Sequence, residues 1–212
     1  MTPAEDINSS TTTLSNQDAS GRESSSSASA AAQLSSAQLT LRNALRQFPD
    51  FPIPGIDFCD ILPLFANPAI HKTLISALEL QIAQSFGNAK PDVIVGLDAR
   101  GFLFGPSLAL HLGVAFAPVR KKGKLPGPCV TAEYVKEYGA DLFQMQEDAV
   151  KPGQKVLIVD DIIATGGSAA AAAELVHQLK GIVIGFQFIL TIPGLDGHKK
   201  LGDAPVAVLI DF

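Results

Sequence analysis

Short apolar runs alternate with amphipathic stretches along most of this chain, a pattern typical of a sheet covered by helices. The apolar runs that predict strands lie at 92–96, 114–119, 156–159, 182–190 and 206–210. Helical periodicity precedes or separates these runs, at 67–87, 102–112 and 168–179. Because strands and helices alternate, we predict an α/β fold with a doubly wound, mostly parallel sheet.

Two segments depart from this alternation. After a short amphipathic helix expected at 37–47, residues 48–60 carry three prolines within six positions, which favours a stiff, extended backbone. This segment either presents its backbone to a flat heterocycle or is a plain connector, and the residues alone favour neither. Residues 129–138 and 142–146 predict a β-hairpin around 138–141, which is either a lid or a solvated hairpin.

The first 33 residues differ in composition from the rest. They are rich in Ser, Thr and Ala and contain almost nothing that could form a core, so we predict a disordered tail at 1–33 and a folded domain at 34–212. A transit peptide is the alternative, because Ser-rich leaders exist. Such leaders are rich in Arg and poor in acids, whereas this segment carries four acidic residues against a single Arg22.

Composition argues against several classes of function. With 212 residues, 47% of them hydrophobic, the chain suits one domain, and its net charge of −5 argues against general nucleic-acid binding. No apolar run approaches the roughly 18 residues of a membrane-spanning helix, so we expect no membrane partner. Cys59 and Cys129 make no disulfide framework, which favours a reducing, cytoplasmic location. The four His are isolated, so we expect no resident metal site.

The strongest chemical signal is the stretch KVLIVDDIIATGGS at 155–168. A buried strand runs into Asp160 and Asp161, and a turn at 164–168 then leads into an alanine-rich helix. A helix N-terminus offers unpaired N–H groups to a phosphate, and glycines let the backbone approach it closely. The two carboxylates can accept hydrogen bonds from sugar hydroxyls. An ordinary βα turn is the alternative, but an unused acid pair there is costly.

A second set of polar residues follows two other strands. Asp98, Ala99 and Arg100 follow the strand at 92–96, and four cations within five residues follow the strand at 114–119. Motifs for a Walker-type nucleotide triphosphatase, a Rossmann dehydrogenase and a serine hydrolase are absent. One phosphate cradle, one acid pair and one cationic patch remain, and together they suit a sugar carrying a 5-phosphate and a pyrophosphate.

Several stretches carry a family resemblance: FPDFPIPGIDFCDILPL, GLDARGFLFGPSLA, RKKGKLPGP and EYGADLFQMQEDA. Together with 156–168 they resemble the type I phosphoribosyltransferases and, more narrowly, the adenine phosphoribosyltransferase family, from about Leu39 to the end. The resemblance implies transfer of 5-phosphoribose from phosphoribosyl pyrophosphate to adenine, giving AMP and pyrophosphate. It also implies Mg²⁺ bound through the substrate, a small N-terminal hood, a β-hairpin lid and a homodimer.

The resemblance further implies roles for single residues on the sugar and its phosphates. The ribose hydroxyls would meet Asp160 and Asp161, and the 5-phosphate would lie on Ala164, Thr165, Gly166, Gly167 and Ser168. The pyrophosphate loop would be Asp98, Ala99 and Arg100, with a peptide between the first two that is often cis in the family. Further pyrophosphate contacts would come from Arg120, Lys121 and Lys124, some across a dimer interface.

The remaining implied roles concern the base and the lid. Glu137 and Tyr138 would close on the sugar, with Glu137 the candidate for proton transfer and Arg100 a further catalytic residue. Adenine would meet Ile56, Asp57, Phe58 and Cys59, largely through the backbone of Asp57 and Cys59. The family usually has Arg where this chain has Cys59, and an apolar residue where it has Asp57. Two alternatives are transfer to another purine base and a ligand-sensing regulator without catalysis.

Overall fold

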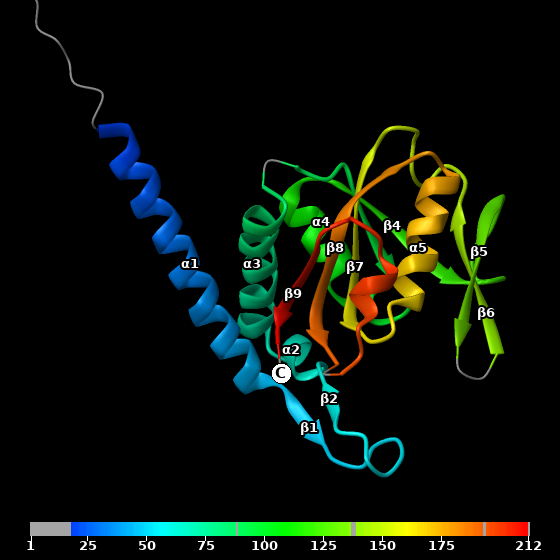
Figure 1. Cartoon of the computed structure of the whole chain (residues 1–212), viewed down its shortest axis with the longest axis horizontal. Coiled ribbons are helices and arrows are strands. Elements are labelled where there is room, and N and C mark those ends of the chain that lie inside the picture. Colours follow the sequence, from blue (N-terminus) through cyan, green and yellow to red (C-terminus); the bar gives the residue numbers. More distant parts are fainter. Residues whose placement is uncertain (1–17, 88, 137–138, 193, 212) are drawn as a thin grey trace, which may run out of the picture.

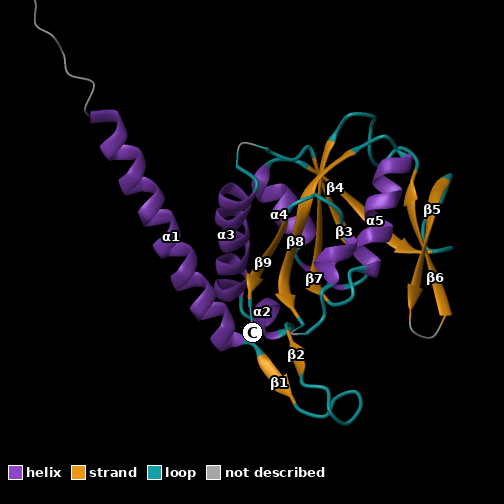
Figure 2. Cartoon of the chain, in the orientation of Figure 1, coloured by secondary structure: helices purple, strands orange, loops and turns teal. Residues whose placement is uncertain are grey.

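The computed structural model describes residues 18–87, 89–136, 139–192 and 194–211. Its centre is formed by five parallel strands: β3 (Val93–Leu97), β4 (Ala115–Lys121), β7 (Lys155–Ile163), β8 (Ile182–Thr191) and β9 (Val206–Ile210). An antiparallel hairpin of β5 (Cys129–Lys136) and β6 (Gly139–Gln146) joins β4 through β6. The order across the sheet is β5-β6-β4-β3-β7-β8-β9 (Figure 1, Figure 2). The predicted α/β fold with a mostly parallel sheet is confirmed.

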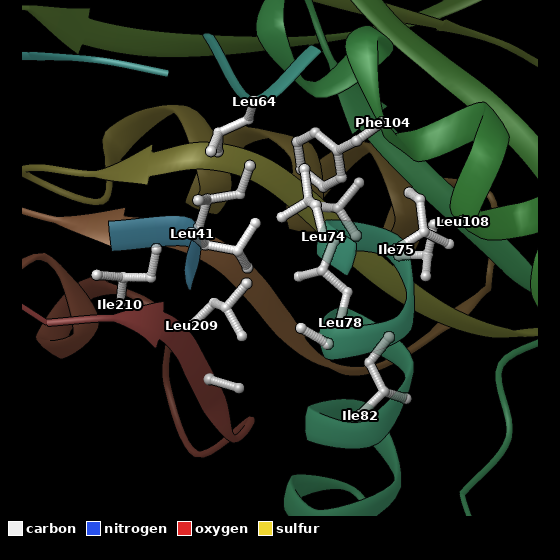
Figure 3. Close-up of a cluster of buried hydrophobic side chains, with 14 of the residues drawn as sticks. Leu41, Leu64, Leu74, Ile75, Leu78, Ile82, Phe104, Leu108, Leu209 and Ile210 are labelled. Carbon is white, nitrogen blue, oxygen red and sulfur yellow. The ribbon is translucent and has the colours of Figure 1, made fainter. Parts of the chain in front are cut away.

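Helices cover both faces of this sheet. One face carries α1 (Asp18–Ala44), α3 (Pro68–Ser85) and α4 (Gly105–Leu112), and the other carries α5 (Gly167–Gln178). Successive residues of a strand point to opposite faces, so β7 contributes to both cores. Leu157 and Val159 pack with α1, α3 and α4, in the core shown in Figure 3. Val156 and Ile158 point to the opposite face and pack with α5. This burial on both sides fixes the end of β7, where the acid pair lies.

The course of α1 corrects the predicted start of the first helix, whereas the disordered tail at 1–33 stays a prediction. The helix begins at Asp18 rather than near Ala37, so residues 18–33 are helical, whereas 1–17 lie outside the described residues. Leu34 and Leu41 are buried in the core, and Figure 1 shows the N-terminal part of α1 extending away from the sheet. The C-terminal half of α1 packs on the core through Leu34 and Leu41. Once this half is helical, adding further turns toward the N-terminus requires no new nucleation, and the alanines before Leu34 favour such turns.

A two-stranded antiparallel sheet, which the sequence pattern did not reveal, follows α1. It consists of β1 (Arg46–Phe48) and β2 (Phe58–Asp60), and we call residues 46–60 the hood. The helix expected to reach residue 47 ends instead at Ala44. Strands of three residues are too short to produce a recognisable alternation, which explains why the proline-rich segment indicated only an extended backbone.

The other predicted elements differ from the structure mainly at their ends. The side chain of Asn67 caps α3 as expected, accepting hydrogen bonds from the N–H groups of Ala69 and Ile70. The hairpin is present, and its pairing reaches Lys136 and Gly139, so the second strand begins before the predicted Leu142. Short helical turns that the sequence did not indicate are α2 (Pro63–Ala66) and η2 (Gly197–Lys200). The helix expected at 102–112 is divided into η1 (Arg100–Leu103) and α4. None of the described helices is long and apolar enough to cross a bilayer.

Candidate active site

The main candidate site lies at the carboxyl ends of β3 and β7, where ligands of open α/β sheets bind. The segments after these strands and the N-terminus of α5 surround a cavity of about 240 Å³, which we call the sheet cavity. The predicted residues that line it are Asp98, Ala99, Arg100, Lys121, Asp160, Asp161, Ala164, Thr165, Gly166, Gly167 and Ser168. The fold therefore brings together most of the residues that the sequence assigned to the sugar and its phosphates.

The turn at 164–168 passes unusually close to another loop. Gly166 has a φ of +76°, in the left-handed region that favours glycine, and it directly precedes α5. No side chain caps α5, so its first N–H groups can bind a ligand in the cavity. Gly197 packs against this turn so tightly that a Cβ on either Gly166 or Gly197 would overlap the backbone of the other. Sequence reasoning missed Gly197, because no motif links residue 197 to the turn.

The acid pair lies inside β7 rather than after it, because this strand continues to Ile163. Asp161 is buried, and its Oδ2 lies 2.6 Å from Nε of Arg100. The N–H of Asp161 donates to Oδ1 of Asp160 at 2.9 Å. Burial raises the pKa of Asp160 well above its ordinary range, and the adjacent Asp161 carboxylate raises it further. Burial also raises the pKa of Asp161, and the positive charge of Arg100 opposes that rise.

The cavity wall from the hairpin was not part of the predicted site. Tyr134 and Phe143 line it as a stacked pair with ring centroids 4.6 Å apart. The hydroxyl of Tyr134 donates to Oδ2 of Asp141 at 3.3 Å, and Nζ of Lys121 lies 3.7 Å from the same oxygen. This contact joins the hairpin to β4 at the edge of the cavity. Glu137 and Tyr138, the predicted lid residues, lie outside the described residues.

The structure separates two of the predicted cations from this cavity. Arg120 and Lys124 are absent from its lining, and Nη1 of Arg120 donates to the carbonyl oxygen of Lys124 at 3.2 Å. Nε of Arg120 donates to Oδ2 of Asp98 at the same distance. Asp98 is thereby held beside Ala99, and the peptide between Asp98 and Ala99 is cis, as the family resemblance implies.

A second cavity, of about 370 Å³, lies under the hood, and we call it the hood cavity. Its lining consists of Phe48, Phe51, Phe58, Asp60, Ile61, Leu62 and Arg100. Phe51 and Phe58 meet edge to face with centroids 5.2 Å apart. An apolar, aromatic pocket of this kind suits a flat heterocycle, which favours the base-presenting interpretation of the hood over a plain connector. The aromatic residues at 48, 51 and 58 were the sequence signal for it.

Of the four residues predicted to meet the base, only Phe58 lines the hood cavity. Ile56 and Asp57 are exposed, and Cys59 packs against the core beneath α1 and α3. Successive residues of β2 point to opposite faces, which explains the position of Cys59. Phe58 and Asp60 lie on the face toward the hood cavity, and Cys59 lies on the opposite face. Burial, followed by the charge of Asp60, raises the pKa of the Cys59 thiol. The predicted backbone contacts of Asp57 and Cys59 stay a prediction.

Comparison with known proteins identifies the family. A family model described as the phosphoribosyl transferase domain matches residues 63–198. The chain is 60% identical over 168 residues to adenine phosphoribosyltransferase of Yarrowia lipolytica, covering 79% of this chain and 92% of the relative. It is 53% identical to a crystal structure of adenine phosphoribosyltransferase from Saccharomyces cerevisiae, with a TM-score of 0.80 over 83% of this chain and 99% of that one. The chain therefore belongs to the adenine phosphoribosyltransferase family.

Proposed function

We propose that the chain transfers 5-phosphoribose from phosphoribosyl pyrophosphate to adenine, giving AMP and pyrophosphate, with Mg²⁺ bound through the substrate. Family membership supports the reaction, and the yeast relative was solved with adenine and an imino-altritol bisphosphate. The observation that carries the proposal is the position of Arg100, which lines both cavities. The sugar carbon that exchanges pyrophosphate for the base would react where these cavities meet.

The turn at 164–168 suits the 5-phosphate end of the substrate. The first N–H groups of α5 and the dipole of this helix attract an anion, and the hydroxyls of Thr165 and Ser168 can donate further hydrogen bonds. The close contact between Gly166 and Gly197 keeps the turn in place. The phosphate would thus anchor the sugar at the end of β7, beside the acid pair.

The acid pair and Arg100 suit the charges that develop at the sugar. The base nitrogen bonds to the anomeric carbon, while the bond from that carbon to the pyrophosphate oxygen breaks and its electron pair leaves with pyrophosphate. Positive charge grows on the ring, where Asp160 and Asp161 can stabilise it, and Arg100 and Lys121 can stabilise the leaving group. The proton released by adenine would pass to Glu137, which lies outside the described residues.

The ion pair between Arg100 and Asp161 connects substrate binding to this chemistry. Arg100 is engaged by Asp161 at 2.6 Å, so an arriving pyrophosphate has to compete with that carboxylate for the guanidinium. Once the guanidinium turns to the pyrophosphate, the oxygens of Asp161 become free to accept hydrogen bonds from the ribose hydroxyls. One exchange of partners would therefore serve both the pyrophosphate and the ribose hydroxyls.

Magnesium would bind in the sheet cavity mainly through oxygen atoms of the substrate. Among the described residues, no group of three or more His, Cys, Asp or Glu is arranged to hold a metal ion. Mg²⁺ prefers oxygen ligands, which the substrate phosphates supply, and the carboxylates of the described lining that could approach it are Asp98, Asp160 and Asp161. When bound, Mg²⁺ neutralises charge on the leaving pyrophosphate.

A homodimer in the cytoplasm completes the proposal. Arg120 and Lys124 are partly or fully exposed and do not line the sheet cavity of their own chain. This position supports the expectation that some of these cations reach the pyrophosphate of a neighbouring subunit. Light scattering coupled to size-exclusion chromatography would measure the mass in solution, and a monomer at micromolar concentration would contradict the dimer.

The test of the function is pyrophosphate release from phosphoribosyl pyrophosphate with Mg²⁺, measured with and without adenine. Release that depends on both adenine and Mg²⁺ is the expected result. Parallel reactions with hypoxanthine, guanine and xanthine examine the other purine bases, and faster release with one of them would change the acceptor. Binding of phosphoribosyl pyrophosphate without release for any purine would favour the ligand-sensing regulator.

A further inference from the structure

Asp60 is a buried carboxylate in the wall of the hood cavity, and the proposed chemistry gives it no part. Only 9% of its surface is exposed, although it belongs to a hood whose other strand, β1, is exposed throughout. A buried carboxylate is costly unless its oxygens are hydrogen-bonded or paired. The partners of Asp60 therefore indicate what it does.

Both oxygens of Asp60 are occupied by groups from different elements. Oδ1 accepts the N–H of Leu62 at 2.8 Å, just before α2. Oδ2 accepts two hydrogen bonds from Arg46 of β1, from Nη2 at 2.6 Å and from Nε at 3.2 Å. Asp60 thus ties together β1, β2 and the start of α2. A charge-assisted, two-donor contact of this kind fixes geometry as well as charge.

The register of the hood places this ion pair beside the aromatic rings. Arg46 lies opposite Asp60, and Phe48 lies opposite Phe58, two residues along the same pair of strands. Residues two apart on a strand share a face, and Phe48, Phe58 and Asp60 all line the hood cavity. The guanidinium carbon of Arg46 also lies 5.9 Å from the centroid of the Phe48 ring.

The loop that joins the two strands has its own contacts: the N–H of Phe51 donates to the carbonyl oxygen of Ile56 at 3.0 Å, and the N–H of Gly55 donates to Oδ1 of Asp50 at 2.7 Å. The strands themselves are short. Each strand has three residues, and a slip of one residue would turn Phe48 and Phe58 away from the cavity. The loop between them is exposed from Phe51 to Asp57. The Arg46–Asp60 ion pair is a side-chain contact directly across the two strands, and it favours the register that places Phe48 opposite Phe58.

We propose that Arg46 and Asp60 are a positioning pair for the acceptor base, and this inference rests on the proposed transfer to a purine. The pair holds Phe48 and Phe58 at the spacing that encloses the base, without a chemical step of its own. Neither member lines the sheet cavity, so the pair acts on the base and not on the sugar phosphates. Breaking it should weaken base binding selectively.

The experiment compares Arg46→Ala and Arg46→Lys with Glu79→Gln as the matched control. Glu79 belongs to a surface pair with His111, joined at 2.8 Å, and it lines neither cavity. Calorimetry with AMP measures binding of base and phosphate together, and ribose 5-phosphate measures the phosphate end alone. Neither ligand requires turnover. Steady-state kinetics with Mg²⁺ then gives separate KM values for adenine and phosphoribosyl pyrophosphate.

Arg46→Ala should weaken AMP binding about tenfold and raise the KM for adenine by a similar factor. The affinity for ribose 5-phosphate and the KM for phosphoribosyl pyrophosphate should stay within about twofold of the wild-type values. Arg46→Lys keeps the charge but not the two-donor fork, so an effect of about threefold is expected. Glu79→Gln should match the wild type. The side chain of Arg46 is 59% exposed, so both Arg46 variants should fold, and thermal unfolding checks this.

The inference is wrong if AMP and ribose 5-phosphate affinities fall together, or if Arg46→Ala leaves AMP binding unchanged. Should Arg46→Ala fail to fold, Arg46→Lys decides, and equal AMP affinity in that variant and the wild type overturns the proposal. Failure of the proposed function gives a different result: the wild type then shows no adenine-dependent release of pyrophosphate, whatever the Arg46 variants bind.

Discussion

The sheet cavity is formed by the ends of long, buried elements, whereas the hood cavity is formed by two strands of three residues each. Val156 to Val159 of β7 are fully buried, so the backbone of the fold itself carries the acid pair and the phosphate turn. In the hood, by contrast, the three aromatic rings that line the cavity depend on one ion pair and on the exposed loop between the two strands.

This difference shows how one protein can bind the sugar phosphates and the acceptor base through separate structural features. The phosphate half depends on backbone N–H groups, which every residue of the right conformation supplies, and on a few carboxylates and cations. The base half depends on side chains in a small, exposed sheet. We therefore expect substitutions at the sheet cavity to cause large losses, and those in the hood to cause smaller losses confined to the base.

The largest effect is expected from Gly197→Ala. A Cβ at this position would overlap the backbone of Ala164 and Gly166, so the phosphate turn has to move. Displacement of a binding group by about 1 Å can cost about 100-fold, so kcat/KM for phosphoribosyl pyrophosphate should fall by about that factor. Asp203→Ala, an exposed change in the same loop, is the control. Wild-type kinetics in Gly197→Ala would remove Gly197 from the support of this turn.

A somewhat smaller loss is expected from Asp161→Asn. The amide offers the ribose hydroxyls one acceptor oxygen instead of two, and we expect this loss to outweigh the release of Arg100 from its carboxylate partner. Calorimetry with phosphoribosyl pyrophosphate and Mg²⁺ should give an affinity about 30-fold below the wild type, in the range for the loss of hydrogen bonds to a charged group. Asp203→Asn is the control. Equal affinities would contradict the assignment of Asp161 to the sugar.

Substitutions in the hood should have smaller effects, and these effects should be confined to binding of the base. Phe58→Ala removes a ring that lines the hood cavity and meets Phe51 edge to face, so the adenine KM should rise about tenfold. The KM for phosphoribosyl pyrophosphate should stay within about twofold. Phe58→Leu keeps an apolar side chain, so its KM for adenine should lie between those of the wild type and Phe58→Ala. A parallel rise in both KM values would show that the two cavities are not independent.

The smallest effect concerns stability and its dependence on pH. Because the pKa of Asp160 is raised on folding, its protonated form stabilises the fold below the ordinary value of 3.8, and this contribution is lost as pH rises through the raised pKa. Asn stays neutral at every pH. Without substrate, Asp160→Asn should therefore match the wild-type Tm in acid and exceed it by about 2–4 °C at high pH, equivalent to about 1 kcal/mol.

Thermal unfolding monitored by circular dichroism from about pH 3 to about pH 8 measures this difference. Activity in the same variant should fall, because the neutral amide cannot stabilise a cationic ring. A Tm difference that does not change with pH would contradict the raised pKa of Asp160.

The part of the sheet cavity formed by residues 160–168 could be predicted because these residues are contiguous in the sequence. A buried strand, two acids, a glycine turn and a helix follow one another at 155–179, and each signal is local. The contribution of Gly197 was not predictable in the same way, since it depends on a backbone contact between loops far apart in the chain. Likewise, the pairing of Arg100 with Asp161 joins two strand ends that only the sheet order brings together.

The hood was harder to predict for a different reason. Prolines and aromatic residues indicated an extended segment, but three-residue strands leave no periodicity to read. Which side chains face the cavity depends on the β1–β2 register, so Phe58 was predicted while Asp60 was missed and Cys59 faces the core. The helix α1 begins at Asp18 rather than near Ala37, and its early start was not predicted because the apolar positions that reveal a helix occur only where it packs on the core, as at Leu34 and Leu41.

The most direct test of the two-cavity arrangement is a crystal structure of the protein with AMP. The phosphate should lie against the N–H groups of Gly166, Gly167 and Ser168, and the adenine ring should lie in the hood cavity against Phe58. The ribose should then span the boundary that Arg100 forms between the two cavities. An adenine ring outside the hood cavity, with the phosphate bound as expected, would contradict the assignment of this cavity to the base.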